Sequence, residues 1–318
     1  MQEKTEKITK FAIIRGNSAK VQKDGRIIYT PSLIQPGLSG MSMKTEGNSF
    51  DSVLLRSDIR FNSGKLEFTL KCQSHETSAL LHLSSIEGHL ISCGYSRQWK
   101  KFLITITDDN SRGRTLSDAG KLDDYDLDTE IHFQITVKGS QVSLSINDIY
   151  LCSANISIIN TPIELFIESA GECEISNIVK HDSGSKPSAF VVMQFSKEYD
   201  ELYDDVIRPV TENLGYECIR ADDINTSTPI LYDIIQSIKD SSVVVADITP
   251  DNPNVFYEVG YSHAIEKPTI LLCDRKRVTS LPFDIKGFRT LFYENTIAGK
   301  EKVVIGLTKF LNASNPTV

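Results

Sequence analysis

One segment near the C-terminus, residues 241–273, constrains the fold more than any other part of the chain. Its first part, Val243 to Ala246, is an apolar run rich in β-branched residues, which is typical of a parallel strand covered on both faces. A loop with two prolines follows, then a helical pattern over 255–265 and a second apolar run over 269–273. This order of strand, helix and strand predicts a right-handed βαβ unit.

Polar residues gather where this unit is expected to bind ligands. Asp247 and Asn254 lie at the carboxyl end of the predicted sheet, which is the ligand-binding edge of open α/β sheets. Asn254 is also the expected N-cap of the helix. Glu258 shares a helix face with Tyr261 and Ser262, at i+3 and i+4. A carboxylate here with a second acid nearby suits the stabilisation of positive charge at an anomeric carbon. The alternative is that Glu258 only complements the helix dipole.

Several segments of residues 186–311 carry a family resemblance. AFVVMQFS from Ala189, RADDI from Arg220, VVADITPDNPNVFYEVGYSHA and KPTILL together resemble a bacterial TIR-like family, which is similar to the nucleoside 2-deoxyribosyltransferases. The resemblance implies a flavodoxin-like sheet and an enzyme of N-glycosidic bonds whose glutamate matches Glu258. In the deoxyribosyltransferases that glutamate attacks the anomeric carbon. In TIR-type NAD hydrolases it is thought to engage the ribose next to nicotinamide.

The chain departs from the family pattern in two places. Gln194 stands where the usual Met-Pro-Phe has proline, and Asn252 stands where the deoxyribosyltransferases carry an acid. The first departure affects contacts to the base, and the second weakens the transferase interpretation.

On this resemblance we expect an NAD hydrolase (NADase) that cleaves NAD at the nicotinamide–ribose bond, with NAD as substrate and no cofactor. Glu258 and Asp247 are the expected catalytic residues, Phe195 is expected to stack on a base, and Arg220 or Asp222 to contact phosphate or ribose. Alternatively, Arg220 pairs with a neighbouring aspartate and only fixes its loop. The substrate-binding residues are Gln194, Phe195, Ser196, Arg220, Asp222, Asn254, Tyr261 and Ser262.

The resemblance also implies antiviral (antiphage) defence and a homo-oligomer, activated by assembly or by a ligand of the N-terminal domain. Two alternatives stay open. One is a nucleoside or deoxynucleotide glycosidase or deoxyribosyltransferase, and the other is a non-catalytic nucleotide-binding signalling module.

The first half of the chain has a different pattern, made of short alternating runs separated by glycines. In KLEFTLK, residues 65–71, Leu66, Phe68 and Leu70 share one face. Many such strands with regular turns predict an antiparallel β-sandwich. The last strands also resemble the closing half of concanavalin-like (laminin-G-like) jelly rolls. Trp99 among cations could stack on a sugar or a base, although cover for one edge of the sandwich is the favoured interpretation.

The pattern changes at residues 181–187, HDSGSKP, which we take as a linker. We therefore expect a multi-domain chain with a jelly-roll-like β-sandwich for sensing or interaction in residues 1–180. Residues 188–318 are expected to form an α/β flavodoxin-like (TIR-like) domain with a parallel sheet.

Composition limits the classes of partner that the chain can be expected to bind. A net charge of −8 gives no basic footprint for nucleic acid and argues against an anionic membrane surface. The six cysteines and six histidines lack the spacing of metal sites. The N-terminus has no apolar run of signal-peptide length, so we expect a cytoplasmic protein.

Overall fold

The computed structural model of the chain describes residues 5–32, 51–85, 88–182, 186–221, 230–249, 251–276 and 288–314. The chain divides into two compact units. The first contains residues 1–137, 142–154 and 160–184, and the second contains residues 138–141, 155–159 and 185–318. Within the described residues, none of the helices has the length and apolar character needed to cross a membrane.

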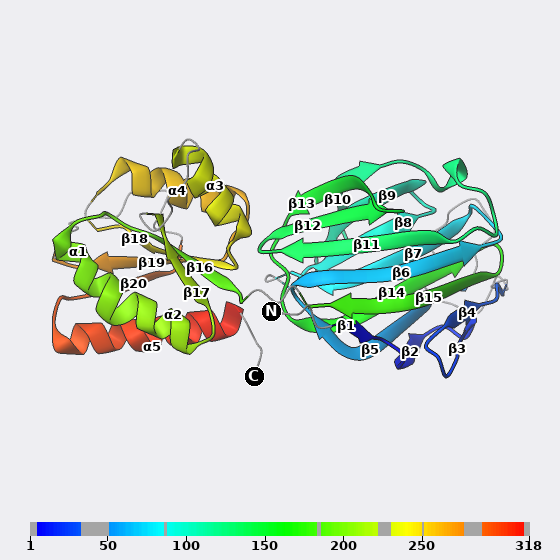
Figure 1. The fold of residues 1–318 in the computed structure, drawn as a ribbon, viewed down its shortest axis with the longest axis horizontal. Coiled ribbons are helices and arrows are strands. Elements are labelled where there is room, and N and C mark those ends of the chain that lie inside the picture. Colours follow the sequence, from blue (N-terminus) through cyan, green and yellow to red (C-terminus); the bar gives the residue numbers. More distant parts are fainter. Residues whose placement is uncertain are drawn as a thin grey trace. The chain divides into compact units, whose positions relative to one another are not determined.

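Two antiparallel sheets stack face to face in the first unit (Figure 1). Neighbours in one sheet are, in order, β13 (Ile149–Asn155), β12 (Gln141–Ile146), β11 (Ile131–Lys138), β6 (Gly64–Cys72), β15 (Cys173–His181), β4 (Ile27–Tyr29) and β3 (Ala19–Val21), while β1 (Thr5–Lys7) also pairs with β15. Neighbours in the other are β10 (Gly113–Ala119), β9 (Lys101–Thr107), β8 (Leu90–Ser96), β7 (Thr77–Ser84), β14 (Thr161–Ser169), β5 (Val53–Phe61) and β2 (Phe11–Arg15). This is a jelly-roll sandwich, so the predicted antiparallel β-sandwich is confirmed.

The alternating sequence pattern builds the core of the sandwich. On β6 the side chains of Leu66, Phe68 and Leu70 are buried, while the residues between them face the other way. The antiparallel register places Phe68 opposite Phe133 of β11. Their rings stack with centroids 4.6 Å apart, inside the range in which aromatic pairs attract. Phe102 of β9 packs against Phe133 from the facing sheet, with centroids 5.8 Å apart.

The second unit is built on a parallel sheet with the order β17 (Glu217–Arg220), β16 (Ser188–Val192), β18 (Val243–Asp247), β19 (Thr269–Asp274) and β20 (Thr290–Tyr293). Its helices are α1 (Lys197–Leu202), α2 (Arg208–Asn213), α3 (Ile230–Asp240), α4 (Pro253–Ala264) and α5 (Ile297–Ser314). α3 and α4 cover one face of the sheet, and α1, α2 and α5 cover the other (Figure 1). The central strands are therefore apolar on both faces, as the run at 243–246 predicts.

The apolar pattern predicts a first strand over 189–195, and a helix over 197–214 that Pro209 kinks or divides. Two boundaries differ from the sequence expectations. β16 ends at Val192, so residues 193–195 lie beyond the strand. The N-cap of α4 is Asn252 and not Asn254, because Pro253 occupies the first helical position, where its missing N–H costs nothing. A π-helical turn, Tyr203–Ile207, joins α1 to α2 immediately before Pro209. The irregular turn agrees with the expectation that this proline disturbs the helix.

We expect Phe133→Ala to lower the free energy of unfolding by about 3–5 kcal/mol, because it leaves a cavity between the rings of Phe68 and Phe102. Urea denaturation of the full chain measures this change. Tyr150→Ala, which truncates an exposed ring of β13, is the matched control and should change stability by less than about 0.5 kcal/mol. Equal losses in the two variants would show that the aromatic stack is not central to the sandwich core.

Candidate functional site

The side chain of the predicted catalytic aspartate is buried and accepts two hydrogen bonds. Asp247 ends β18, and its Oδ2 accepts a hydrogen bond from the Tyr293 hydroxyl at 2.9 Å. Its Oδ1 accepts from the backbone N–H of Thr249 at 3.1 Å. The Thr249 hydroxyl in turn accepts from the backbone N–H of Asp274, at the end of the neighbouring strand. Asp247 therefore ties together the carboxyl ends of β18, β19 and β20.

The predicted catalytic glutamate lies in the second turn of α4 and is half-buried. Burial raises the pKa of the Glu258 carboxyl to about 7. The Ser262 hydroxyl donates to the backbone carbonyl of Glu258 at 2.8 Å and so bonds within the helix. Tyr261 packs against the apolar cluster between α4 and the sheet. Of the three residues on this helix face, Glu258 is therefore the one whose side chain neither bonds within the helix in this way nor belongs to the apolar cluster.

The loop after β16 meets the start of α4. The Gln194 Oε1 accepts from the Asn252 side chain at 3.4 Å, while Asn254 is exposed and its backbone N–H donates to Asn252 at 2.9 Å. Ser196 precedes α1 in extended conformation and its side chain makes no cap bond. The structure therefore brings Gln194 to Asn252, a residue that the site prediction does not include.

The predicted base-stacking residue, in the loop after β16, lies close to the predicted phosphate-binding residue at the end of β17. Phe195 is exposed, and the Arg220 guanidinium lies 5.6 Å from the centre of its ring. Arg220 also bonds Asp200 of α1 at 2.9 Å and lies 4.2 Å from the ring centre of Tyr203. Arg220 thus pairs with an aspartate, as in the alternative in which it only fixes local structure. The aspartate is Asp200 and not one next to Arg220 in the sequence. Asp222 lies outside the described residues.

A hollow of about 430 Å³, partly open to solvent, lies elsewhere in this unit. Its walls come from α1, the ends of β19 and β20, and the start of α5, and they include Tyr199, Asp274 and Tyr293. Of the predicted site residues that the structure describes, none contributes to its lining.

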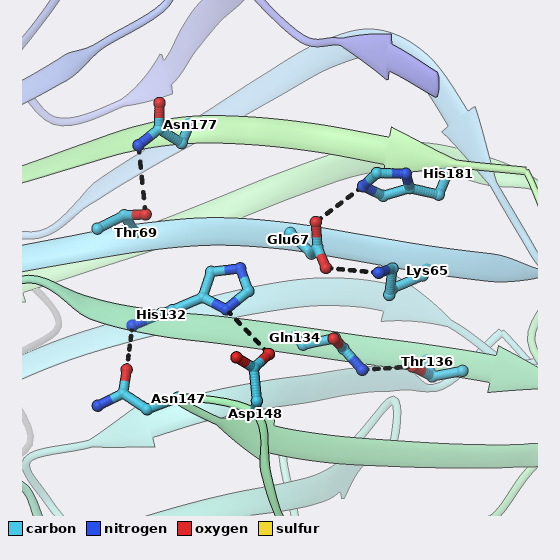
Figure 2. Close-up of polar contacts among 10 residues, drawn as sticks. All are labelled: Lys65, Glu67, Thr69, His132, Gln134, Thr136, Asn147, Asp148, Asn177 and His181. Carbon is cyan, nitrogen blue, oxygen red and sulfur yellow. Dashed lines mark hydrogen bonds and ion pairs between the residues drawn. The ribbon is translucent and has the colours of Figure 1, made fainter. Parts of the chain in front are cut away.

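A second polar constellation lies on the outward face of the sandwich, over β11, β6 and β15 (Figure 2). The register places Glu67 of β6 opposite Gln134 of β11. Residues two positions before and after each of them on the same strand face the same way. We call this group the polar face; it comprises Lys65, Glu67, Thr69, His132, Gln134, Thr136, Asn147, Asp148, Asn177 and His181. Outward-facing side chains of such sheets are usually well exposed, but these are largely half-buried or buried.

Glu67 is at the centre of the polar face, with 16% of its side chain exposed. Its Oε1 lies 2.7 Å from the Lys65 ammonium, and its Oε2 lies 2.7 Å from Nε2 of His181. Burial alone would raise the pKa of the Glu67 carboxyl, but the hydrogen bonds from Lys65 and His181 outweigh it and hold the pKa below its usual value. An ionised carboxylate only accepts hydrogen bonds, so the His181 Nε2 must carry a proton. Nδ1 of His181 faces the Thr5 hydroxyl at 3.2 Å.

Neutral polar groups surround this ion pair (Figure 2). The Gln134 amide donates to the Thr136 hydroxyl, and the Asn177 amide to the Thr69 hydroxyl, each at a long 3.5 Å. The backbone N–H of His132 donates to the Asn147 side chain at 2.8 Å, which fixes the adjoining turn. Long bonds are weak, so the amides and hydroxyls retain hydrogen-bonding capacity for a ligand.

Sequence reasoning missed the polar face, although its signal was present. The alternation in KLEFTLK predicts the core, and the residues at the intervening positions of this segment and of EIHFQITV, residues 130–137, supply six of the ten residues of this face. Trp99, the one candidate named on this unit, lies in the turn between β8 and β9 with 54% of its surface exposed. Exposure alone does not decide between a stacking role and cover for an edge, so the interpretation of Trp99 stays a prediction.

Comparison with known proteins gave no matching family model and no matching curated protein. Solved structures match more than half of the chain. A carbohydrate-binding module (CBM66) from Bacillus subtilis has 10% identity and a TM-score of 0.38, covering 54% of this chain and 96% of the other. A Bacillus licheniformis β-glucanase has 12% identity and a TM-score of 0.38, covering 57% and 98%. A laminarinase from Flavobacterium sp. UMI-01 has 10% identity and a TM-score of 0.38, covering 54% and 93%. At these values the likeness assigns neither family nor substrate.

These comparisons correct the expected function. They show no similarity to TIR-like or deoxyribosyltransferase proteins. The resemblance stated for residues 186–311 is therefore wrong as an assignment. The NAD hydrolase activity and the antiphage role inferred from it are wrong as well.

The raised pKa of Glu258 predicts a pH-dependent stability. Because the folded state binds this proton more tightly than the unfolded state, the contribution is complete below about pH 4.5. It is lost as the pH rises through about 7. Its size is at most roughly 3 kcal/mol, at about 1.4 kcal/mol per pKa unit. Urea denaturation of Glu258→Gln between pH 4.5 and 8 should show a flatter profile than wild type. Glu301→Gln, at an exposed position of α5, is the control, and a profile unchanged by Glu258→Gln would contradict the burial effect.

Proposed function

We propose that the sandwich binds a neutral carbohydrate on its polar face. The observation that carries the proposal is the half-buried array of amide, hydroxyl and imidazole groups around a charge-neutralised Glu67. This ligand takes the place of the unspecified one expected for the N-terminal domain.

The chemistry of the array matches that of a sugar. Each sugar hydroxyl both donates and accepts hydrogen bonds, and so do the Gln134 and Asn177 amides and the Thr136 hydroxyl. These groups project from neighbouring strands, so their spacing is fixed by backbone hydrogen bonds and little conformational entropy is lost on binding. The Lys65 ammonium balances the charge of Glu67, and His181 occupies the other carboxylate oxygen, which favours a neutral ligand over a phosphorylated one.

The same groups favour binding over hydrolysis. Glycosidases of the common type need one carboxylic acid to protonate the leaving oxygen and a second carboxylate across the bond. The lowered pKa of Glu67 keeps it ionised, which is unsuited to the acid role. Asp148, the other carboxylate of the polar face, lies on a turn with 87% of its side chain exposed, so its position is not fixed by packing.

For the second unit we propose a flavodoxin-like fold without a TIR assignment. Numbered within the unit, its parallel strands run second, first, third, fourth and fifth across the sheet, which is the flavodoxin-like order. This unit would accompany the carbohydrate-binding sandwich as a separate domain.

Affinity gel electrophoresis of the full chain in soluble β-glucan, xylan, pullulan and mucin tests the binding proposal. At least one polymer should retard the wild type. Gln134→Ala should weaken that retardation about five- to tenfold, because one hydrogen bond contributes roughly 1 kcal/mol. Glu67→Gln should also weaken it, because the loss of charge releases Lys65 and His181.

Gln22→Ala is the matched control, an exposed glutamine of the same unit, and should migrate as wild type. No retardation by any of the four polymers would refute the proposal. Loss of binding in Trp99→Ala together with normal binding in Gln134→Ala would move the site to the turn between β8 and β9, and would also refute it.

A further inference from the structure

The hollow in the second unit lies at the edge of the parallel sheet where such sheets bind ligands. Asp274 ends β19 and Tyr293 ends β20, and both residues line the hollow. Open α/β sheets bind ligands beyond the carboxyl ends of their strands. The volume of about 430 Å³ falls within the range of small-molecule sites. The proposed carbohydrate site belongs to the other unit, so the hollow has no ligand assigned to it.

The walls of the hollow are apolar and aromatic. Its lining includes four buried side chains, those of Tyr199, Leu202, Tyr293 and Val303. The Tyr293 hydroxyl donates a hydrogen bond to the buried Asp247 at 2.9 Å. Because this hydroxyl is engaged inside the unit, Tyr293 contributes its ring to the wall. Such a lining suits a ligand with an apolar surface, and aromatic rings also attract cations.

The charge around the hollow is negative. The described residues of its lining include three carboxylates, on Glu201, Asp274 and Glu294, and one ammonium group. That ammonium, of Lys300, lies 3.1 Å from Asp205, which balances its charge. Asp274 is only 4% exposed, so its carboxylate is held at the wall by the surrounding structure. An excess of carboxylates beside apolar walls attracts cations and repels anions.

We propose that the hollow binds a small methylated ammonium ion. A quaternary ammonium group has no N–H to donate, and its charge is spread over an apolar surface that suits the rings of Tyr199 and Tyr293. The surrounding carboxylates balance that charge. The first turn of α5 does not favour an anion instead, because the N–H of Gly299 already donates to the Thr296 hydroxyl at 3.1 Å.

Two probes of matched size separate charge from shape. Choline and its neutral isostere 3,3-dimethylbutan-1-ol have the same branched head, but only choline is charged. In saturation-transfer difference NMR with the full chain, the methyl protons of choline should receive saturation from the protein. The isostere should bind about five- to tenfold more weakly, because it lacks the attraction to rings and carboxylates. Glycine betaine, which adds a carboxylate to the methylated group, should also bind more weakly, because the acidic lining repels it.

Substitutions at exposed acids of the lining locate the site without disturbing the core. Glu294→Gln and Glu201→Gln should each weaken choline binding about two- to fivefold, the range expected for one partly solvated charge. Glu301→Gln, at an exposed glutamate of α5 that is not among the lining residues, is the matched control and should bind as wild type.

Three results would overturn the proposal. The absence of saturation transfer to choline in the wild type would show that the hollow does not take this cation. Equal binding of choline and its isostere would reduce the hollow to an apolar cavity without charge recognition. Effects of Glu294→Gln and Glu201→Gln no larger than that of Glu301→Gln would place any binding elsewhere.

Discussion

The antiparallel ladder that joins β11, β6 and β15 fixes the sandwich core and the polar face together. Because side chains alternate, the register that buries Phe68 against Phe133 also sets Glu67 opposite Gln134 on the other side of the sheet. A slip by one residue would turn the carboxylate into the core and the aromatic ring into solvent. The apolar energy of the core therefore holds the polar groups in place, and the position of Glu67 needs no separate stabilisation.

Patterns that depend on neighbours in sequence predicted the two sheets well. The predicted helix boundaries were wrong where two nearby residues compete to cap a helix or where a polar bond extends it. The alternation in KLEFTLK and the apolar run at 243–246 predict one antiparallel and one parallel sheet, and both are present. The cap of α4 was misplaced because two asparagines compete, and Pro253 favours the one before it. The apolar pattern predicts a closing helix over 303–311, but α5 begins at Ile297 because the Thr296 hydroxyl stabilises its first turn by accepting a hydrogen bond from the N–H of Gly299. That bond does not depend on apolar periodicity.

The functional prediction failed for a different reason. A glutamate in a helix after an apolar strand is a local feature, and its raised pKa follows from burial without indicating a substrate. The polar face depends on contacts that sequence distance conceals: Glu67 and His181 are 114 positions apart, and Thr69 and Asn177 are 108 apart. The alternating pattern could have shown that residues 65, 67 and 69 share a face, but not which strand supplies their partners.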